Sequence, residues 1–133
     1  EHMEAMDGFR FVVDGVVPNG LTRVLSLASL GMTFKAVMAS VDMILTKPGY
    51  GTIVEAVALG IPVVYVRRYN FPDEPPLVDH LHRYGRGAEL SLADFLQGRW
   101  NAAIEQAFAR PLSSTPPPLS GAQDAAHILK DYV

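Results

Sequence analysis

The chain of 133 residues contains no cysteine. This absence excludes disulfides, thiolate zinc sites and a cysteine nucleophile, and it fits a reducing compartment such as the cytoplasm. No sign of charge dominates, because 11 basic side chains stand against 14 acidic ones for a net charge of −3, and no basic stripe points to nucleic acid. No apolar run approaches the roughly 20 residues that span a bilayer. We therefore expect a cytoplasmic protein with no transmembrane segment and no nucleic-acid partner.

What is present suits a single globular α/β domain, since 49% of the residues are hydrophobic and 19% are charged. The first three residues, 1–3, resemble the remnant of an expression tag, which leaves residues 4–133 as the domain. A proline- and serine-rich connector is expected at 111–120, followed by a terminal helix at 121–133. The strand-like run that follows the start so closely suggests a piece of a longer protein.

Hydrophobic periodicity divides the chain into alternating strands and helices. Short apolar, β-branched runs predict strands at residues 9–13, 22–28, 42–46, 63–66 and 87–90. Helical spacing predicts helices at residues 33–40, 53–59, 77–85, 93–96, 99–109 and 121–132. Such alternation is typical of a parallel sheet with helices on both faces, which is a Rossmann-like α/β fold. Ligands of these sheets bind beyond the carboxyl ends of the strands, so the turn at 47–52 and the loop at 67–76 should share one rim.

The stretch from Lys47 to Glu55 carries the strongest signal for a binding site. Gly49 and Gly51 would allow positive φ and a close approach of backbone to ligand. Thr52 is a natural N-cap, and the amides that follow it would point toward a bound anion such as a diphosphate. The same Thr52–Glu55 spacing is also a capping box, in which the two side chains satisfy the helix start themselves. The residues alone leave both interpretations open.

Other candidate residues have weaker signals. Arg67 and Arg68 end a strand at the expected rim and could neutralise phosphate, although rim arginines are commonly solvated. Tyr50 could stack on a base or a sugar, or could simply cover the turn. His80 and His82 stand two apart, which places them on different sides of a helix. We predict neither a metal site nor a cofactor.

The run from Asp42 to Val66 resembles the carboxyl-terminal, donor-binding half of GT-B glycosyltransferases, in particular the MurG-like and UDP-glycosyltransferase-like branch. The resemblance extends over about residues 24–90, and its glycine-rich motif is fairly specific. It implies half of a GT-B fold that lacks its first strand–helix unit. The acceptor-binding amino-terminal half is also absent, and it would belong to the same chain or to a partner subunit.

The resemblance also implies roles for particular residues. Gly49, Tyr50, Gly51 and Thr52 match the loop that holds the donor diphosphate. Glu55 matches the carboxylate that accepts hydrogen bonds from the ribose hydroxyls.

Further matches and departures concern the sugar and the stereochemistry. Asp73 and Glu74 stand where related enzymes contact the sugar hydroxyls, although a glutamine is usual at the Glu74 position. Lys47 would place a cation near the diphosphate. Retaining enzymes carry a Glu at the Lys47 position, so the resemblance favours inversion.

We therefore expect the donor-binding half of an inverting, metal-independent glycosyltransferase that uses a nucleoside-diphosphate sugar, with a UDP-hexose as the expected donor and an unknown acceptor. No catalytic residue is assigned, and this segment alone should be inactive. Three alternatives remain: a GT-B type nucleotide-sugar epimerase, a non-catalytic nucleotide-sugar-binding subunit, and a plain Rossmann-like domain whose turn is only a cap.

Overall fold

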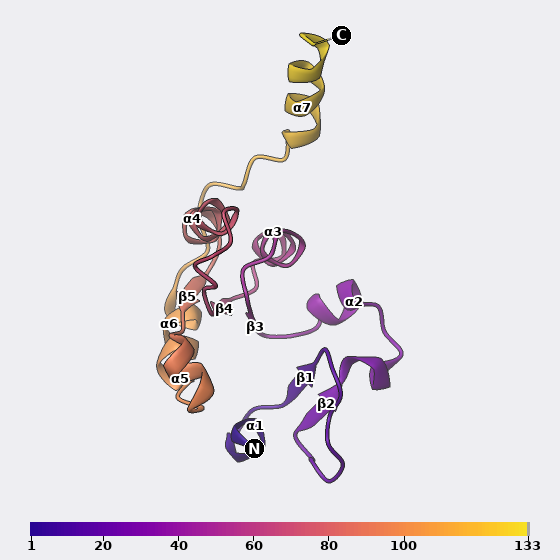
Figure 1. The fold of residues 1–133 in the computed structure, drawn as a ribbon, viewed down its shortest axis with the longest axis vertical. Helices are drawn as coiled ribbons and strands as arrows, with labels where there is room; N and C mark the ends of the chain where they lie inside the picture. The colour runs from indigo at the N-terminus through magenta and orange to yellow at the C-terminus, as the bar shows by residue number, and fades with distance from the viewer. Residues whose placement is uncertain (133) are drawn as a thin grey trace.

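A computed structural model describes residues 1–132 as a chain of short parallel strands and intervening helices (Figure 1). The strands are β1 (Phe11–Val13), β2 (Val24–Ser26), β3 (Ile44–Thr46), β4 (Val63–Tyr65) and β5 (Gly87–Glu89). The helices are α1 (His2–Ala5), the 3-10 helix η1 (Leu27–Leu30), α2 (Phe34–Met38), α3 (Tyr50–Leu59), α4 (Glu74–Tyr84), α5 (Leu92–Leu96), α6 (Asn101–Ala109) and α7 (Gly121–Lys130). The α/β class expected from the sequence is confirmed.

The strands are parallel, as predicted, but they form two sheets rather than one. β1 pairs with β2, whereas β3, β4 and β5 form a separate three-stranded sheet with β4 in the centre. The sequence pattern did not indicate that the strands would divide between two sheets. Periodicity identifies strands, but which strands pair depends on contacts that are distant in sequence.

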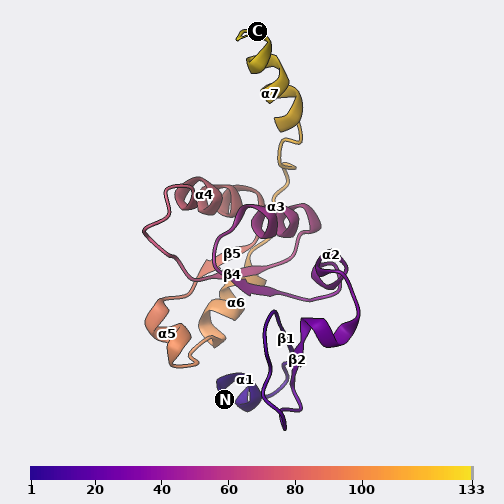
Figure 2. The ribbon, with the colours of Figure 1, turned by 45° about the vertical axis from the view of Figure 1, so that its right-hand side comes forward.

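Helices cover both faces of the three-stranded sheet, as expected (Figure 2). Successive side chains of a strand point to opposite faces. Val63 and Tyr65 of β4 accordingly pack with α3 and α4, while Val64 packs with α6 on the other face. All three side chains are buried, and burying a Val side chain contributes roughly 1.5–3 kcal/mol. This double coverage holds the carboxyl ends of the strands in place.

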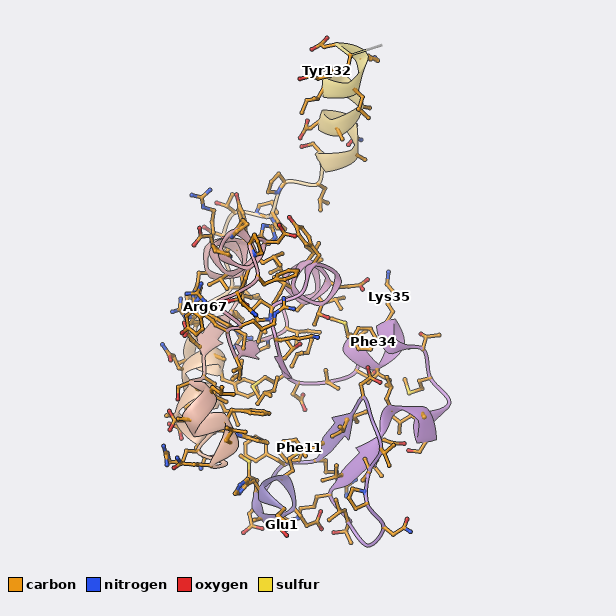
Figure 3. The ribbon with its side chains drawn as sticks, in the orientation of Figure 1. Glu1, Phe11, Phe34, Lys35, Arg67 and Tyr132 are labelled. Carbon is orange, nitrogen blue, oxygen red and sulfur yellow. The ribbon has the colours of Figure 1, made fainter. Side chains whose placement is uncertain are left out.

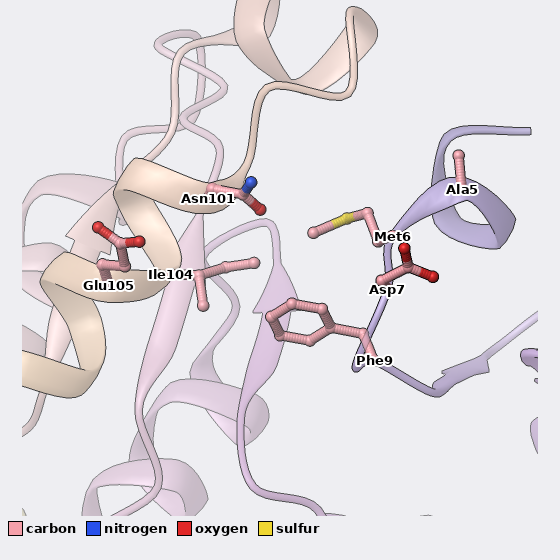
Figure 4. Close-up of a pocket in the computed structure, with 7 residues that line it drawn as sticks. All are labelled: Ala5, Met6, Asp7, Phe9, Asn101, Ile104 and Glu105. Carbon is pink, nitrogen blue, oxygen red and sulfur yellow. The ribbon is translucent and has the colours of Figure 1, made fainter.

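A groove of about 840 Å³ separates the two sheets. It is bordered by β1, by the segment that leads into β3, and by α6, and its walls include Val12, Met43 and Phe108. Phe11 extends from β1 to the edge of the Trp100 ring, with 5.9 Å between the ring centroids (Figure 3). A smaller pocket of about 390 Å³ lies between the α1 segment and α6 (Figure 4).

Two helices begin earlier than the sequence pattern predicted. α3 begins at Tyr50 instead of Ile53, and it ends at Gly60, whose φ of 69° is the left-handed conformation that glycine adopts readily. α4 begins at Glu74, so the prolines that were expected to lie in a loop occupy its first turn. Proline is compatible with a first turn because the amides there have no helical partner.

The last helix, α7, stands away from the remainder of the molecule (Figure 1). None of the residues from Gly121 to Lys130 is buried, although the helix itself and the connector before it were predicted. At the other end, the short α1 forms from residues that include part of the expected tag, and Met3 packs against the cluster around Trp100. Across residues 1–132, no helix has the length and apolar character needed to cross a membrane.

Candidate functional site: the carboxyl rim of the three-stranded sheet

The carboxyl ends of β3, β4 and β5 meet at one edge of the sheet. The strand register pairs Thr46 with Tyr65 and Tyr65 with Glu89. The turn after β3 and the loop after β4 therefore leave the sheet side by side. A hydrogen bond of 2.5 Å from Arg68 Nη2 to the Pro48 carbonyl joins them directly. The prediction that these two segments share a rim is confirmed.

The start of α3 lies on this rim and has no side-chain cap. Gly49 is the N-cap residue, and its carbonyl accepts a hydrogen bond of 2.9 Å from the Ile53 amide. Tyr50, Gly51 and Thr52 supply the amides of the first turn, which have no partner inside the helix. Such a start attracts anions, because the unpaired amides and the helix dipole both act on them.

The capping-box interpretation of Thr52 and Glu55 was wrong. Thr52 is the third residue of the helix rather than its cap, and no side chain in the described part of the chain accepts a hydrogen bond at this start. The expected positive φ was also wrong, because Gly49 is extended (φ −142°) and Gly51 is helical. The two glycines provide open space, because apart from the adjacent residues and the nearby helix backbone, a Cβ on either one would meet no described atom within 4 Å.

Charged and aromatic side chains surround this helix start. Lys47 and Tyr50 are exposed, and the Tyr50 residue retains 61% of its surface. Glu55 is partly buried and forms an ion pair of 3.1 Å with Lys35 of α2, which is labelled in Figure 3. The pair is partly solvated and contributes little stability, and the contact of Glu55 with a ribose stays a prediction. Sequence reasoning missed Lys35, because its contact with Glu55 depends on how α2 packs beside α3.

Glu74 has a different environment from the one its sequence position suggested. Its side chain is 1% exposed, and it accepts hydrogen bonds from the Arg67 side chain (3.0 Å) and the Arg68 backbone amide (2.9 Å). Burial by itself raises the pKa of Glu74, but these hydrogen bonds outweigh it and hold the pKa below its usual range. Both carboxylate oxygens are thus occupied by the protein. In this structure Glu74 joins Arg67 and Arg68 at the rim, and its contact with a sugar stays a prediction.

The two arginines are likewise held by the protein. The Arg67 guanidinium lies 4.9 Å from the centroid of the Tyr69 ring, and that of Arg68 lies 4.0 Å from the centroid of the Phe71 ring. Neither guanidinium is fully buried. Both arginines lie at the rim, as the sequence predicted. Their partners in this structure are the Glu74 carboxylate, the Pro48 carbonyl and aromatic rings rather than a phosphate.

The loop after β4 also contains a strained residue that sequence reasoning missed. Tyr69 has a φ of 58°, which is unusual for a bulky residue. The Asn70 amide bonds to the Arg68 carbonyl across it at 2.7 Å, and the Tyr69 hydroxyl donates to Glu89 at 3.1 Å. No local sequence signal marks this conformation. Asp73, by contrast, is exposed at the start of α4, and its side chain makes no capping hydrogen bond.

The cavities and metal-type residues lie elsewhere or are dispersed. Neither the 840 Å³ groove nor the 390 Å³ pocket includes any residue from Lys47 to Glu55, so neither of these two cavities reaches the helix start. Among residues 1–132, no three His, Cys, Asp or Glu side chains gather in an arrangement that could hold a metal ion. His82 instead contacts the buried Tyr65 hydroxyl at 2.7 Å.

Parallel strands with helices on both faces describe an α/β chain consistent with a Rossmann-like half-domain. Over 96 residues the chain is 38% identical to L-arabinokinase of Arabidopsis thaliana. The match covers 71% of this chain but only 9% of the relative, so this chain spans about a tenth of that protein. No family model and no solved structure matches the chain.

Proposed function

We propose that the rim binds the diphosphate of a nucleoside-diphosphate sugar, and that the chain is the donor-binding half of an inverting, metal-independent glycosyltransferase. One observation carries the proposal: the amides that open α3 lack a side-chain cap, at the carboxyl edge of parallel strands and beside two glycines with open space at their Cβ positions. An uncapped helix start at this edge suits an anion. The resemblance of the run from Asp42 to Val66 to GT-B donor domains narrows that anion to a sugar nucleotide.

In this proposal, each group at the rim has a physical task. The amides of residues 50–52 and the Lys47 ammonium stabilise the charge that grows on the β-phosphate as the nucleoside diphosphate leaves. Glu55 accepts hydrogen bonds from the ribose hydroxyls, and the exposed Asp73 is the remaining candidate for the sugar. The base that activates the acceptor belongs to another part of the protein, so this segment positions the donor without completing the reaction.

The proposal also assigns a place to the strand–helix unit that the resemblance implies. β1 has one partner strand and β3 has one partner strand, and the 840 Å³ groove lies between them. An additional parallel strand in this groove could pair with β1 on one side and with β3 on the other, and it would then join the two sheets into one. Paired strands lie about 4.8 Å apart. We propose that this unit, and the acceptor-binding half, come from a longer protein or a partner subunit.

A second candidate function is a non-catalytic module that binds a nucleotide sugar within an enzyme of sugar metabolism. The observation that favours it is the match to a segment of L-arabinokinase, a protein named as a kinase rather than a transferase. The rim would then bind the same ligand class without transferring the sugar. Turnover of a UDP-sugar by the complete protein distinguishes the two functions.

A thermal-shift panel tests the proposed ligand class. UDP, UDP-glucose, GDP-mannose, CMP-sialic acid and TDP-glucose are compared at equal concentrations with inorganic phosphate. A ligand present at 100 times its Kd stabilises the folded state by about 2.7 kcal/mol, so at least one nucleotide should raise Tm clearly. A panel in which no nucleotide shifts Tm more than phosphate does would refute nucleotide binding by this chain.

Glu55→Ala tests the ribose contact, with Glu105→Ala as its control. Glu105 is an exposed glutamate of α6, away from the rim. We expect Glu55→Ala to weaken nucleotide affinity about tenfold or more, since a hydrogen bond to a charged group contributes about 1.5–3 kcal/mol. Tm should change little because the Lys35 pair is exposed. Equal affinities for the two variants would remove Glu55 from the site.

A further inference from the structure

The geometry points to Arg68 as a positioning residue that aims the start of α3, with Glu74 as its anchor. This inference rests on the proposed ligand site. It adds a residue that positions the site without contacting the ligand. It begins from a contact between two loops that are 20 residues apart in sequence: the hydrogen bond from Arg68 Nη2 to the Pro48 carbonyl.

The Pro48 end of this contact lies directly before α3, where a rotation of the Pro48–Gly49 peptide plane would redirect the start of the helix. Pro48 is fully buried and directly precedes Gly49, the N-cap of α3. The Pro48 carbonyl belongs to the same peptide plane as the Gly49 amide, so holding the carbonyl fixes that plane. Glycine has no Cβ to restrict its own backbone. The direction of the first-turn amides therefore depends on what holds the residue before it.

The Arg68 end is itself fixed by the protein. Glu74 Oε2 accepts the Arg68 backbone amide at 2.9 Å and lies 3.6 Å from Arg68 Nε. The guanidinium also rests on the Phe71 ring. Arg68 Nε is buried and has no hydrogen-bond partner within residues 1–132, although the side chain as a whole remains partly exposed. The planar guanidinium holds its N–H donors in fixed directions. Arg68 can therefore donate to the Pro48 carbonyl while it stays next to Glu74 and on the Phe71 ring.

Arg67 provides a natural comparison. It also bonds to Glu74, through Nε at 3.0 Å, and it also lies over an aromatic ring. Its side chain makes no contact with the turn that precedes α3 among the hydrogen bonds of the described chain. Removing either arginine therefore disturbs Glu74, but only the loss of Arg68 should release Pro48.

The test compares Arg68→Met, Arg68→Lys and Arg67→Met in amide exchange and in UDP affinity. The Ile53 amide, which bonds to the Gly49 carbonyl, reports the first turn of α3, whereas the Leu81 amide in the buried part of α4 reports global opening. We expect Ile53 exchange to accelerate about tenfold in Arg68→Met and not in Arg67→Met, with Leu81 exchange equal in both. UDP affinity should fall about tenfold in Arg68→Met and recover in part in Arg68→Lys.

The outcomes separate this inference from the ligand proposal. Equal Ile53 exchange in Arg68→Met and Arg67→Met overturns the positioning role, as does parallel acceleration at Ile53 and Leu81, which indicates general destabilisation. Failure of the wild-type chain to bind any nucleotide of the thermal-shift panel refutes the ligand proposal, while the exchange comparison still decides the role of Arg68. If Arg68→Met does not fold, Phe71→Leu removes only the supporting ring, and it should accelerate Ile53 exchange selectively; no selective change again overturns the inference.

Discussion

A negative charge placed at Gly51 should stabilise the fold and at the same time weaken anion binding. Gly51 is the second residue of α3, and a side chain there meets open space. Replacing Gly by Glu gains up to about 1 kcal/mol in helix propensity. A carboxylate in the first turn gains a further 0.3–1 kcal/mol from the helix dipole. Gly51→Glu should therefore stabilise the chain by about 1–2 kcal/mol and raise Tm by roughly 3–8 °C.

The same carboxylate would stand next to a bound diphosphate. At about 5 Å, two like charges repel by about 1–3 kcal/mol for effective dielectric constants between those of water and a protein surface. The Kd for UDP should therefore increase about 5- to 150-fold. Opposite signs for Tm and affinity separate an anion site from a purely structural turn, because damage to the fold would lower both.

Two variants control for shape and for charge. Gly51→Gln has the shape of Gly51→Glu without its charge, and Gly121→Glu adds the same charge at the start of the isolated helix α7. When affinity is measured by calorimetry at low salt, Gly121→Glu should bind UDP about as well as the wild type, and Gly51→Gln should lose less affinity than Gly51→Glu. If Gly51→Glu and Gly51→Gln bind UDP equally, the diphosphate does not contact the start of α3. A decrease in Tm for Gly51→Glu would show that the start of α3 cannot accommodate a carboxylate side chain, and it would contradict the predicted stabilisation.

Three further predictions concern the framework of the rim. Tyr65→Phe removes the hydroxyl that lies 2.7 Å from His82 Nε2 and should cost about 1–2 kcal/mol in urea unfolding, since a half-buried nitrogen loses its partner; an unchanged midpoint would contradict this pairing. Gly87→Ala places a Cβ 2.7 Å from Leu81 Cγ and should cost about 1–3 kcal/mol through overpacking, whereas a stable Gly87→Ala would mean that α4 shifts freely. The pKa of Glu74 is lower in the folded state than the usual 4.5, so its contribution to stability is complete above that value and is lost as pH falls through the folded pKa. Urea midpoints measured from pH 7 to pH 3 should show this loss in the wild type, and the Glu74→Gln variant should show a smaller one.

The order and type of the elements followed from local pattern. The apolar run at residues 63–66 predicted a buried strand, and β4 (Val63–Tyr65) is covered on both faces. The position of α3 between two parallel strands predicted that its start would lie at the carboxyl edge, which the register of β3 and β4 confirms. Parallel strands must all end on the same side, so this part of the site needed no knowledge of side-chain contacts.

The sequence by itself determined the α/β alternation and the rim on which a ligand would meet backbone amides, because both depend on periodicity and on chain direction. Tertiary structure alone decided that the strands fall into two sheets, that Glu74 is buried between Arg67 and Arg68, and that Lys35 reaches Glu55. The physical reason is that a side chain's partner is set by which elements pack together. Spacing along the chain predicts on which face of a helix or strand a residue lies. Only the neighbouring elements in the packed structure determine whether a carboxylate on that face contacts a ligand or an arginine.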